Sequence, residues 1–141
     1  MKIGFNDAIR TPLKNRKALK SFLNLLAKSE KQDFGELNYI FCSDEELLEI
    51  NKRFLKHNYY TDIITFNLSP INNNLIIGEI YISIDRIREN AKTYNTSVAM
   101  ELHRVIFHGI LHLCGYNDKT SDQKSKMTQK ENQYLKKYFR N

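Results

Sequence analysis

Two histidines, a glycine and an aspartate follow one another at fixed spacing late in the chain, within ELHRVIFHGILHLCGYND (101–118). His108 and His112 are four residues apart, so on an α-helix they lie on one face, one turn above the other. Gly115 accepts the left-handed conformation that ends a helix, and the chain can then turn so that Asp118 returns to the same place. Three protein ligands and an open fourth position form a catalytic zinc site. The stretch therefore predicts a helix that ends in a site for one zinc ion per chain, bound by His108, His112 and Asp118.

The complete order H-x-x-x-H-x-x-G-x-x-D is much more specific than the two histidines alone, which could be structural residues on a half-buried face. It has the spacing of the extended metzincin zinc motif, with Asp118 where that motif has its third histidine. Gly109 stands where zinc proteases carry the glutamate that acts as general base. Glycine inside a helix costs about 1 kcal/mol relative to alanine, so Gly109 indicates a close approach by substrate or by packed backbone. The pattern favours a hydrolase that differs from a standard zinc protease.

Apolar periodicity divides the rest of the chain into strands and helices. Strands are predicted where β-branched and aromatic residues gather, at 2–5, 37–42, 62–67 and 75–83, the last two as an antiparallel hairpin. Helices are predicted at 15–28, 43–54, 84–94, 97–114 and 121–138. The last helix presents Met127, Tyr134, Leu135 and Tyr138 toward a core. Without a composition break, residues 1–141 are expected to form one domain of α/β or α+β class, a small mixed sheet packed with helices.

The charge and the apolar content of the chain point to a partner and a compartment. Twenty-two Lys and Arg against 16 Asp and Glu give a net charge of +6 and an isoelectric point near 9.3. Such a surplus favours encounter with RNA, although it also serves plain solubility. No apolar run reaches the roughly 18 residues that cross a membrane, and the N-terminal stretch has no signal-peptide core. Cys42 and Cys114 lie in unrelated segments, as is typical of a reducing compartment, so we expect a cytoplasmic protein.

A family resemblance rests on three segments, HGILHLCGYND (108–118), TDIITF (61–66) and IGEIYIS (77–83). The first resembles the H-G-x-L-H-L-x-G-Y-D-H signature of the YbeY family of bacterial endoribonucleases. The other two are similar to that family's T-D-V-L-S-F and L-G-D-I-x-I-S segments, in the same order. The resemblance implies a mixed sheet packed against the metal helix. It also implies a metal-dependent endoribonuclease specific for single-stranded RNA, acting in ribosomal RNA maturation and ribosome quality control, with ribosomal subunits or ribosomal proteins as partners.

Three positions depart from the family pattern. Asp118 replaces the last histidine, Asn117 replaces the aspartate before it, and Leu55 stands where the family tends to carry an arginine. A carboxylate is still a sound zinc ligand, with a looser metal preference. The family arginine has been regarded as catalytic or substrate-binding, and Arg53 or Lys56 could substitute for it.

Candidates for RNA contact are Arg53, Lys56, His57 and Arg104. His57 lies in a basic connection beside Tyr59, and such a loop could stack on single-stranded bases or could be an ordinary exposed loop.

The chemistry expected from the metal site is hydrolysis by a metal-activated water, whose pKa can fall to about 7. Attack by the 2′-OH of the substrate is an alternative, and no general base is evident in the sequence. Metal-bound histidines usually donate their second ring N–H to a carboxylate or carbonyl, and Asp62, Glu79 and Glu101 are candidates for that partner. Two other functions remain open. One is a non-catalytic RNA-binding ribosome-assembly factor with a structural metal, and the other is a zinc metallopeptidase.

Overall fold

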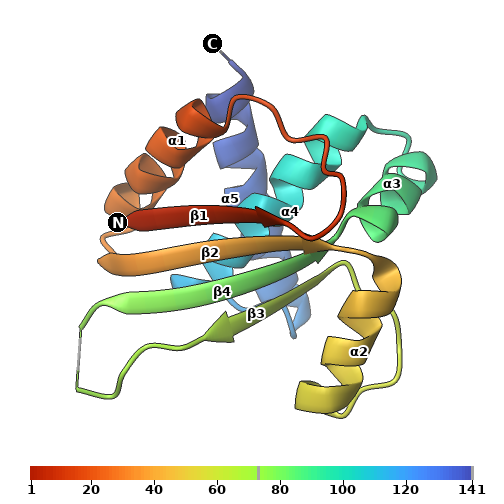
Figure 1. The fold of residues 1–141 in the computed structure, drawn as a ribbon. Helices are drawn as coiled ribbons and strands as arrows, with labels where there is room; N and C mark the ends of the chain where they lie inside the picture. The colour runs from red at the N-terminus through yellow and green to blue at the C-terminus, as the bar shows by residue number, and fades with distance from the viewer. Residues whose placement is uncertain (73, 141) are drawn as a thin grey trace.

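The computed structural model describes residues 1–72 and 74–140. Its strands are β1 (Lys2–Asp7), β2 (Phe34–Cys42), β3 (Ile63–Asn67) and β4 (Ile76–Ser83). Its helices are α1 (Arg16–Ser29), α2 (Asp44–Leu55), α3 (Ile84–Thr93), α4 (Val98–Leu113) and α5 (Ser121–Phe139), as Figure 1 shows. Every predicted helix and strand is present within these residues, and most bounds shift by one to three residues.

The strands pair in the order β1–β2–β4–β3. β1 and β2 are parallel, as are β2 and β4, whereas β3 runs antiparallel to β4 from Ile63 opposite Ile82 to Asn67 opposite Gly78. The predicted mixed sheet and its hairpin are therefore confirmed. β1 continues to Asp7, beyond the predicted end, because Asp7 still pairs with Phe41 of β2.

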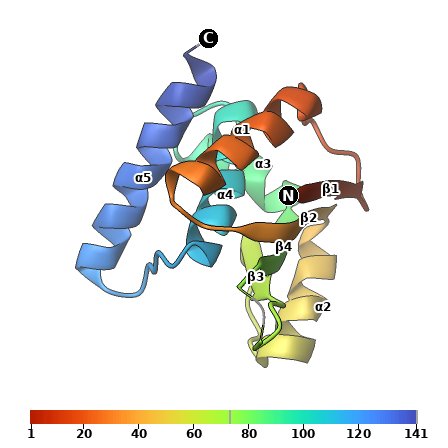
Figure 2. The ribbon, with the colours of Figure 1, turned by 90° about the vertical axis from the view of Figure 1, so that its left-hand side faces the viewer.

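The helices cover both faces of the sheet unequally. Figure 2 shows α1, α4 and α5 on one side and α2 on the other. Alternate residues of β2 and β4, such as Tyr39 and Ile80, enter the large core beneath α1, α4 and α5. The opposite face carries a smaller cluster of Cys42, Leu47 and Ile64 beneath α2. None of the helices within residues 1–72 and 74–140 combines the length and apolarity needed to cross a membrane.

α4 is the helix most enclosed by its neighbours. The Ser97 side chain accepts a hydrogen bond from the Met100 N–H at its start, and ten of its 16 residues are buried. Gly109 faces the sheet, where an added Cβ would lie 2.7 Å from the Ile80 Cδ1 atom and 3.2 Å from the Ile63 Cδ1 atom. The close approach at Gly109 is therefore made by packed strands.

Candidate functional site

The end of α4 carries the two histidines and turns the chain back toward them. Gly115 has a φ of 109°, and its N–H donates to the His112 carbonyl at 3.0 Å. This is the left-handed turn that the sequence predicted. Three residues later, the Asp118 Oδ2 atom lies 3.4 Å from the His108 Nε2 atom. The structure thus brings His108 and Asp118 together across the turn.

The other ring nitrogen of His108 is held by a residue from a different helix. Glu131 of α5 places Oε2 2.7 Å from the His108 Nδ1 atom. Because a carboxylate only accepts hydrogen bonds, the ring donates its Nδ1–H to Glu131. Burial lowers the pKa of His108, but the hydrogen bond and charge of Glu131, together with the charges of Asp118 and Asp62, outweigh burial and raise it above its ordinary value.

In the neutral ring, the geometry around His108 favours a cation between it and Asp118. The Nδ1–H is directed at Glu131, so Nε2 presents a lone pair, and it faces a carboxylate oxygen at 3.4 Å. Two acceptors so close require a proton or a metal ion between them. Two ligands of a tetrahedral zinc ion, each at about 2.0–2.2 Å from it, are about 3.3–3.6 Å apart. The observed separation of these two atoms fits that geometry.

His112 lies on the same helical face but is not yet in place to join them. The ring centroids of His108 and His112 are 6.4 Å apart, whereas two imidazoles on one tetrahedral ion would have centroids about 5 Å apart. Accordingly, across residues 1–72 and 74–140 no three His, Cys, Asp or Glu side chains already form a group that could hold a metal. The His112 side chain is exposed, so burial does not prevent rotation about its side-chain bonds. His112 therefore has the side chain and the helical face of a ligand, but its ring is farther from His108 than two ligands of one ion would be.

A cleft of about 710 Å³ surrounds these residues. His57 and Arg104 line it, as do His108, His112 and Asp118. The other two predicted RNA contacts, Arg53 and Lys56, are exposed but are not among its lining residues. Leu55, which stands in place of the family arginine, does line the cleft and is 40% exposed.

Arg104 is already engaged within the protein. Its Nη1 donates to the Glu131 Oε1 at 2.9 Å, and its Nη2 donates to the Asn132 Oδ1 at 2.6 Å. Glu131 therefore joins Arg104 and His108 with its two oxygens, and its side chain is only 9% exposed. This arrangement fixes the His108 ring and also holds a positive charge at the wall of the cleft.

Glu131 is the site residue that the sequence reasoning missed. The expected partners of His108 were Asp62, Glu79 and Glu101, but Glu79 accepts instead from the Tyr81 hydroxyl. Asp62 accepts from Asn90 Nδ2 at 3.4 Å. A signal was available, because Glu131 lies four residues after Met127 and four before Leu135, on the stripe of α5 predicted to face the core. A carboxylate on a buried stripe needs a partner inside the protein.

Asp62 and Glu101 add negative charge to the cleft. Burial raises the pKa of Asp62, and burial together with the charge of Asp62 raises the pKa of Glu101. Both side chains line the cleft. A cleft with several carboxylates around two imidazoles is suited to a divalent cation.

The fold and the site together define a class of small α+β proteins in which a helix end with two histidines meets a carboxylate in an open cleft. Comparison with known proteins identifies the family within that class. The family described as Endoribonuclease YbeY matches residues 5–139, and the chain belongs to it.

Curated relatives are similar over nearly the whole chain. Endoribonuclease YbeY of Cytophaga hutchinsonii is 50% identical over 131 residues, which are 93% of this chain and 91% of that protein. Endoribonuclease YbeY of Parabacteroides distasonis is 44% identical over 131 residues, with the same two coverages of 93% and 91%. Among solved structures, the solution structure of TM1509 from Thermotoga maritima covers 99% of this chain and 89% of its own, with a TM-score of 0.64 and 29% identity.

Proposed function

We propose that this member of the endoribonuclease YbeY family cleaves single-stranded ribosomal RNA with the help of one zinc ion, in the maturation and quality control of ribosomes in the cytoplasm. Family membership supports RNA cleavage. The observation that supports the metal is the 3.4 Å separation between the His108 Nε2 atom and the Asp118 Oδ2 atom, which matches the spacing of two ligands on one zinc ion. The net charge of +6 supports association with a polyanion such as ribosomal RNA.

The proposed ligands are His108, His112 and Asp118. When bound, zinc supplies Lewis-acid chemistry, since it acidifies a water molecule and offsets charge that develops on a phosphate. Glu131 keeps the proton of His108 on Nδ1 and orients the ring, which is the usual duty of a carboxylate behind a ligand histidine. Arg104 is held in turn by Glu131, so its position relative to His108 is set by the same side chain.

Proton transfer in the cleft is assigned to carboxyl groups outside the ligand set. Asp62 and Glu101 both line the cleft, and the pKa of each is raised, chiefly by burial. A carboxyl group whose pKa lies closer to neutral is a better general base or acid than one with an ordinary pKa. Asp62 and Glu101 are therefore the residues that we propose for general acid or base catalysis, which the sequence did not assign.

The test is single-turnover cleavage of an end-labelled single-stranded RNA, with the same RNA in a duplex for comparison. Zinc-loaded wild type should cleave the single strand, and chelated protein and His112→Ala should lose that activity while remaining folded by circular dichroism. Cys114→Ala is the matched control, because Cys114 lines a different cavity beside Glu30 and should leave cleavage unchanged. Equal cleavage by chelated protein or by His112→Ala would contradict the proposed site.

A binding role in ribosome assembly is the second candidate. It is favoured by Leu55, an apolar side chain lining the cleft at the position where the family arginine is expected. Stoichiometric zinc without cleavage of single-stranded RNA would support this role and would exclude the proposed hydrolysis.

A further inference from the structure

Two exposed rings form an ordered pair at the wall of the cleft. The rings of His57 and Tyr59 are stacked, with centroids 5.1 Å apart and planes inclined by 20°. Tyr59 Oη and His57 Nδ1 share a hydrogen bond of 3.0 Å. Tyr59 is 56% exposed, and both residues line the cleft that contains His108 and Asp118. Tyr59 is thus largely open to solvent in the cleft that contains the candidate metal ligands.

A single buried residue holds both members of the pair. Asn51 of α2 is 1% exposed. Its backbone carbonyl accepts from the His57 N–H at 3.1 Å, and its side-chain amide donates to the Tyr59 carbonyl at 2.9 Å. Because Asn51 is buried within a helix, the backbone of the pair is held at fixed points.

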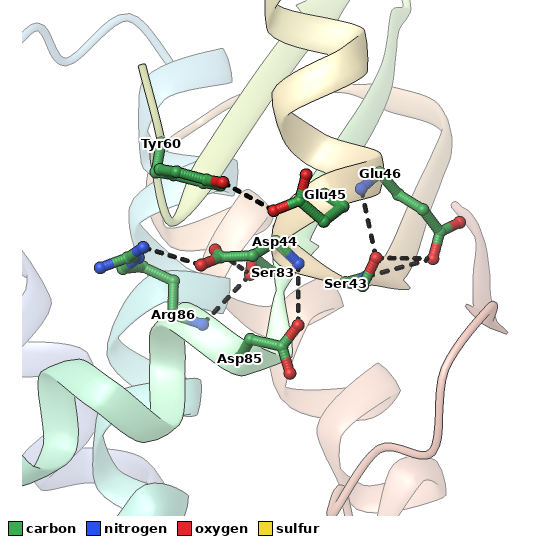
Figure 3. Close-up of polar contacts among 8 residues, drawn as sticks. All are labelled: Ser43, Asp44, Glu45, Glu46, Tyr60, Ser83, Asp85 and Arg86. Atoms are coloured by element: carbon green, nitrogen blue, oxygen red, sulfur yellow. Dashed lines mark hydrogen bonds and ion pairs between the residues drawn. The ribbon is translucent and has the colours of Figure 1, made fainter.

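Tyr60, the residue after Tyr59, is also anchored, as Figure 3 shows. The Tyr60 hydroxyl donates to Glu45 at 2.6 Å, and the Arg86 guanidinium carbon lies 5.4 Å from the centre of the Tyr60 ring. Arg86 also forms an ion pair of 2.7 Å with Asp44, so the loop is connected to the first turns of α2 and α3. Tyr60 therefore anchors the loop to α2 and α3, and the anchored loop carries the rings of His57 and Tyr59.

From this geometry we propose that the His57–Tyr59 pair is a stacking platform for one unpaired nucleobase of the RNA. The inference rests on the proposed function and adds to it a base-binding position beside the metal ligands. Aromatic side chains bind single-stranded nucleic acid by stacking, which tolerates any base because every base has a π-face. A platform fixed before binding loses little conformational freedom when the base arrives. A duplex cannot use it, since its bases are already stacked on one another.

The platform is tested by equilibrium binding, separately from cleavage. The probe is a fluorescent single-stranded oligonucleotide with 2′-O-methyl groups, which block attack by the 2′-OH, measured by anisotropy with chelator present so that metal-dependent hydrolysis is also prevented. Tyr59→Ala should weaken binding about five- to twentyfold, in the lower part of the range for loss of one base stack. Tyr59→Phe keeps the ring and should stay within about threefold of wild type. Tyr94→Ala is the control, because Tyr94 is 66% exposed and does not line the cleft.

A series of oligonucleotides with one abasic position each identifies the stacked base. One of them should bind wild type as weakly as the intact strand binds Tyr59→Ala, and the variant should not distinguish the two strands. The stacking proposal would be overturned if Tyr59→Ala bound the oligonucleotide with wild-type affinity. It would also be overturned if Tyr59→Phe lost as much affinity as Tyr59→Ala. If these binding results are obtained but the protein does not cleave RNA, the proposed hydrolysis is refuted and the stacking platform is not. Failure of one proposal can therefore be told from failure of the other.

Discussion

Replacing Glu131 by alanine should weaken zinc binding although Glu131 is not a proposed ligand. The change removes the acceptor 2.7 Å from His108 Nδ1 and the acceptor 2.9 Å from Arg104 Nη1. The His108 ring then loses the contact that orients it and that keeps its proton away from Nε2. Ordering the His108 ring when a metal binds then costs free energy, so the affinity for zinc falls.

The magnitude follows from the two contacts. Loss of the partner behind a ligand histidine typically lowers metal affinity about 10- to 100-fold, or about 1.4–2.7 kcal/mol. The fold is affected as well, because the Glu131 side chain is only 9% exposed and breaking a buried ion pair costs about 3–5 kcal/mol. The Arg104 side chain is 32% exposed and can turn to water, so we expect about 2–3 kcal/mol from the unfolding free energy.

Zinc affinity would be measured by competition with a chromophoric chelator, and stability by urea unfolding of the metal-free protein. Asn132→Ala is the matched control, since it removes the other partner of Arg104, at 2.6 Å, and leaves His108 bound to Glu131. Its zinc affinity should stay within about twofold of wild type. Glu131→Gln keeps an acceptor and should lie between Glu131→Ala and wild type. The reasoning is refuted if folded Glu131→Ala binds zinc as tightly as wild type, or if Asn132→Ala loses as much affinity.

Two further predictions concern stability. Burial alone would raise the pKa of Glu30, but hydrogen bonds from Tyr134, Tyr116 and Lys130 outweigh it and lower that pKa. Glu30→Gln should therefore cost about 1–2 kcal/mol in urea unfolding at pH 7. The pKa of Glu30 is lower in the folded than in the unfolded protein, so its ionised form stabilises the fold above the unfolded-state pKa, and this contribution is lost as the pH falls through the folded-state pKa. The loss caused by Glu30→Gln should therefore shrink below about pH 4, and an equal loss at pH 7 and pH 3 would contradict the prediction. Gly109→Ala should cost about 1 kcal/mol by the same measurement, since overpacking against the fully buried Ile80 exceeds the gain in helix propensity; a stabilised variant would show that the strand yields.

Local patterns in the sequence were sufficient to predict the helices, the strands and the turn that ends α4. The Ser43 capping box begins a helix at Asp44, and Gly115 takes the positive φ expected of it. His108, His112 and Asp118, which the spacing groups together, all line one cleft. These features depend on contacts within a few residues of chain, because helix periodicity, caps and tight turns are settled locally.

Other features depended on how distant segments pack. Glu131 is 23 residues from His108, and only the packing of α5 against α4 brings its carboxylate to the ring. In the same way, the cleft includes His57 but not Arg53, although both were equal candidates in the sequence. Residue spacing along the chain therefore sets which side chains share a helical face and where the chain turns. The carboxylate that supports His108 and the loop side chains that face the site are set by the packing of distant elements, because no local spacing encodes how those elements lie relative to one another.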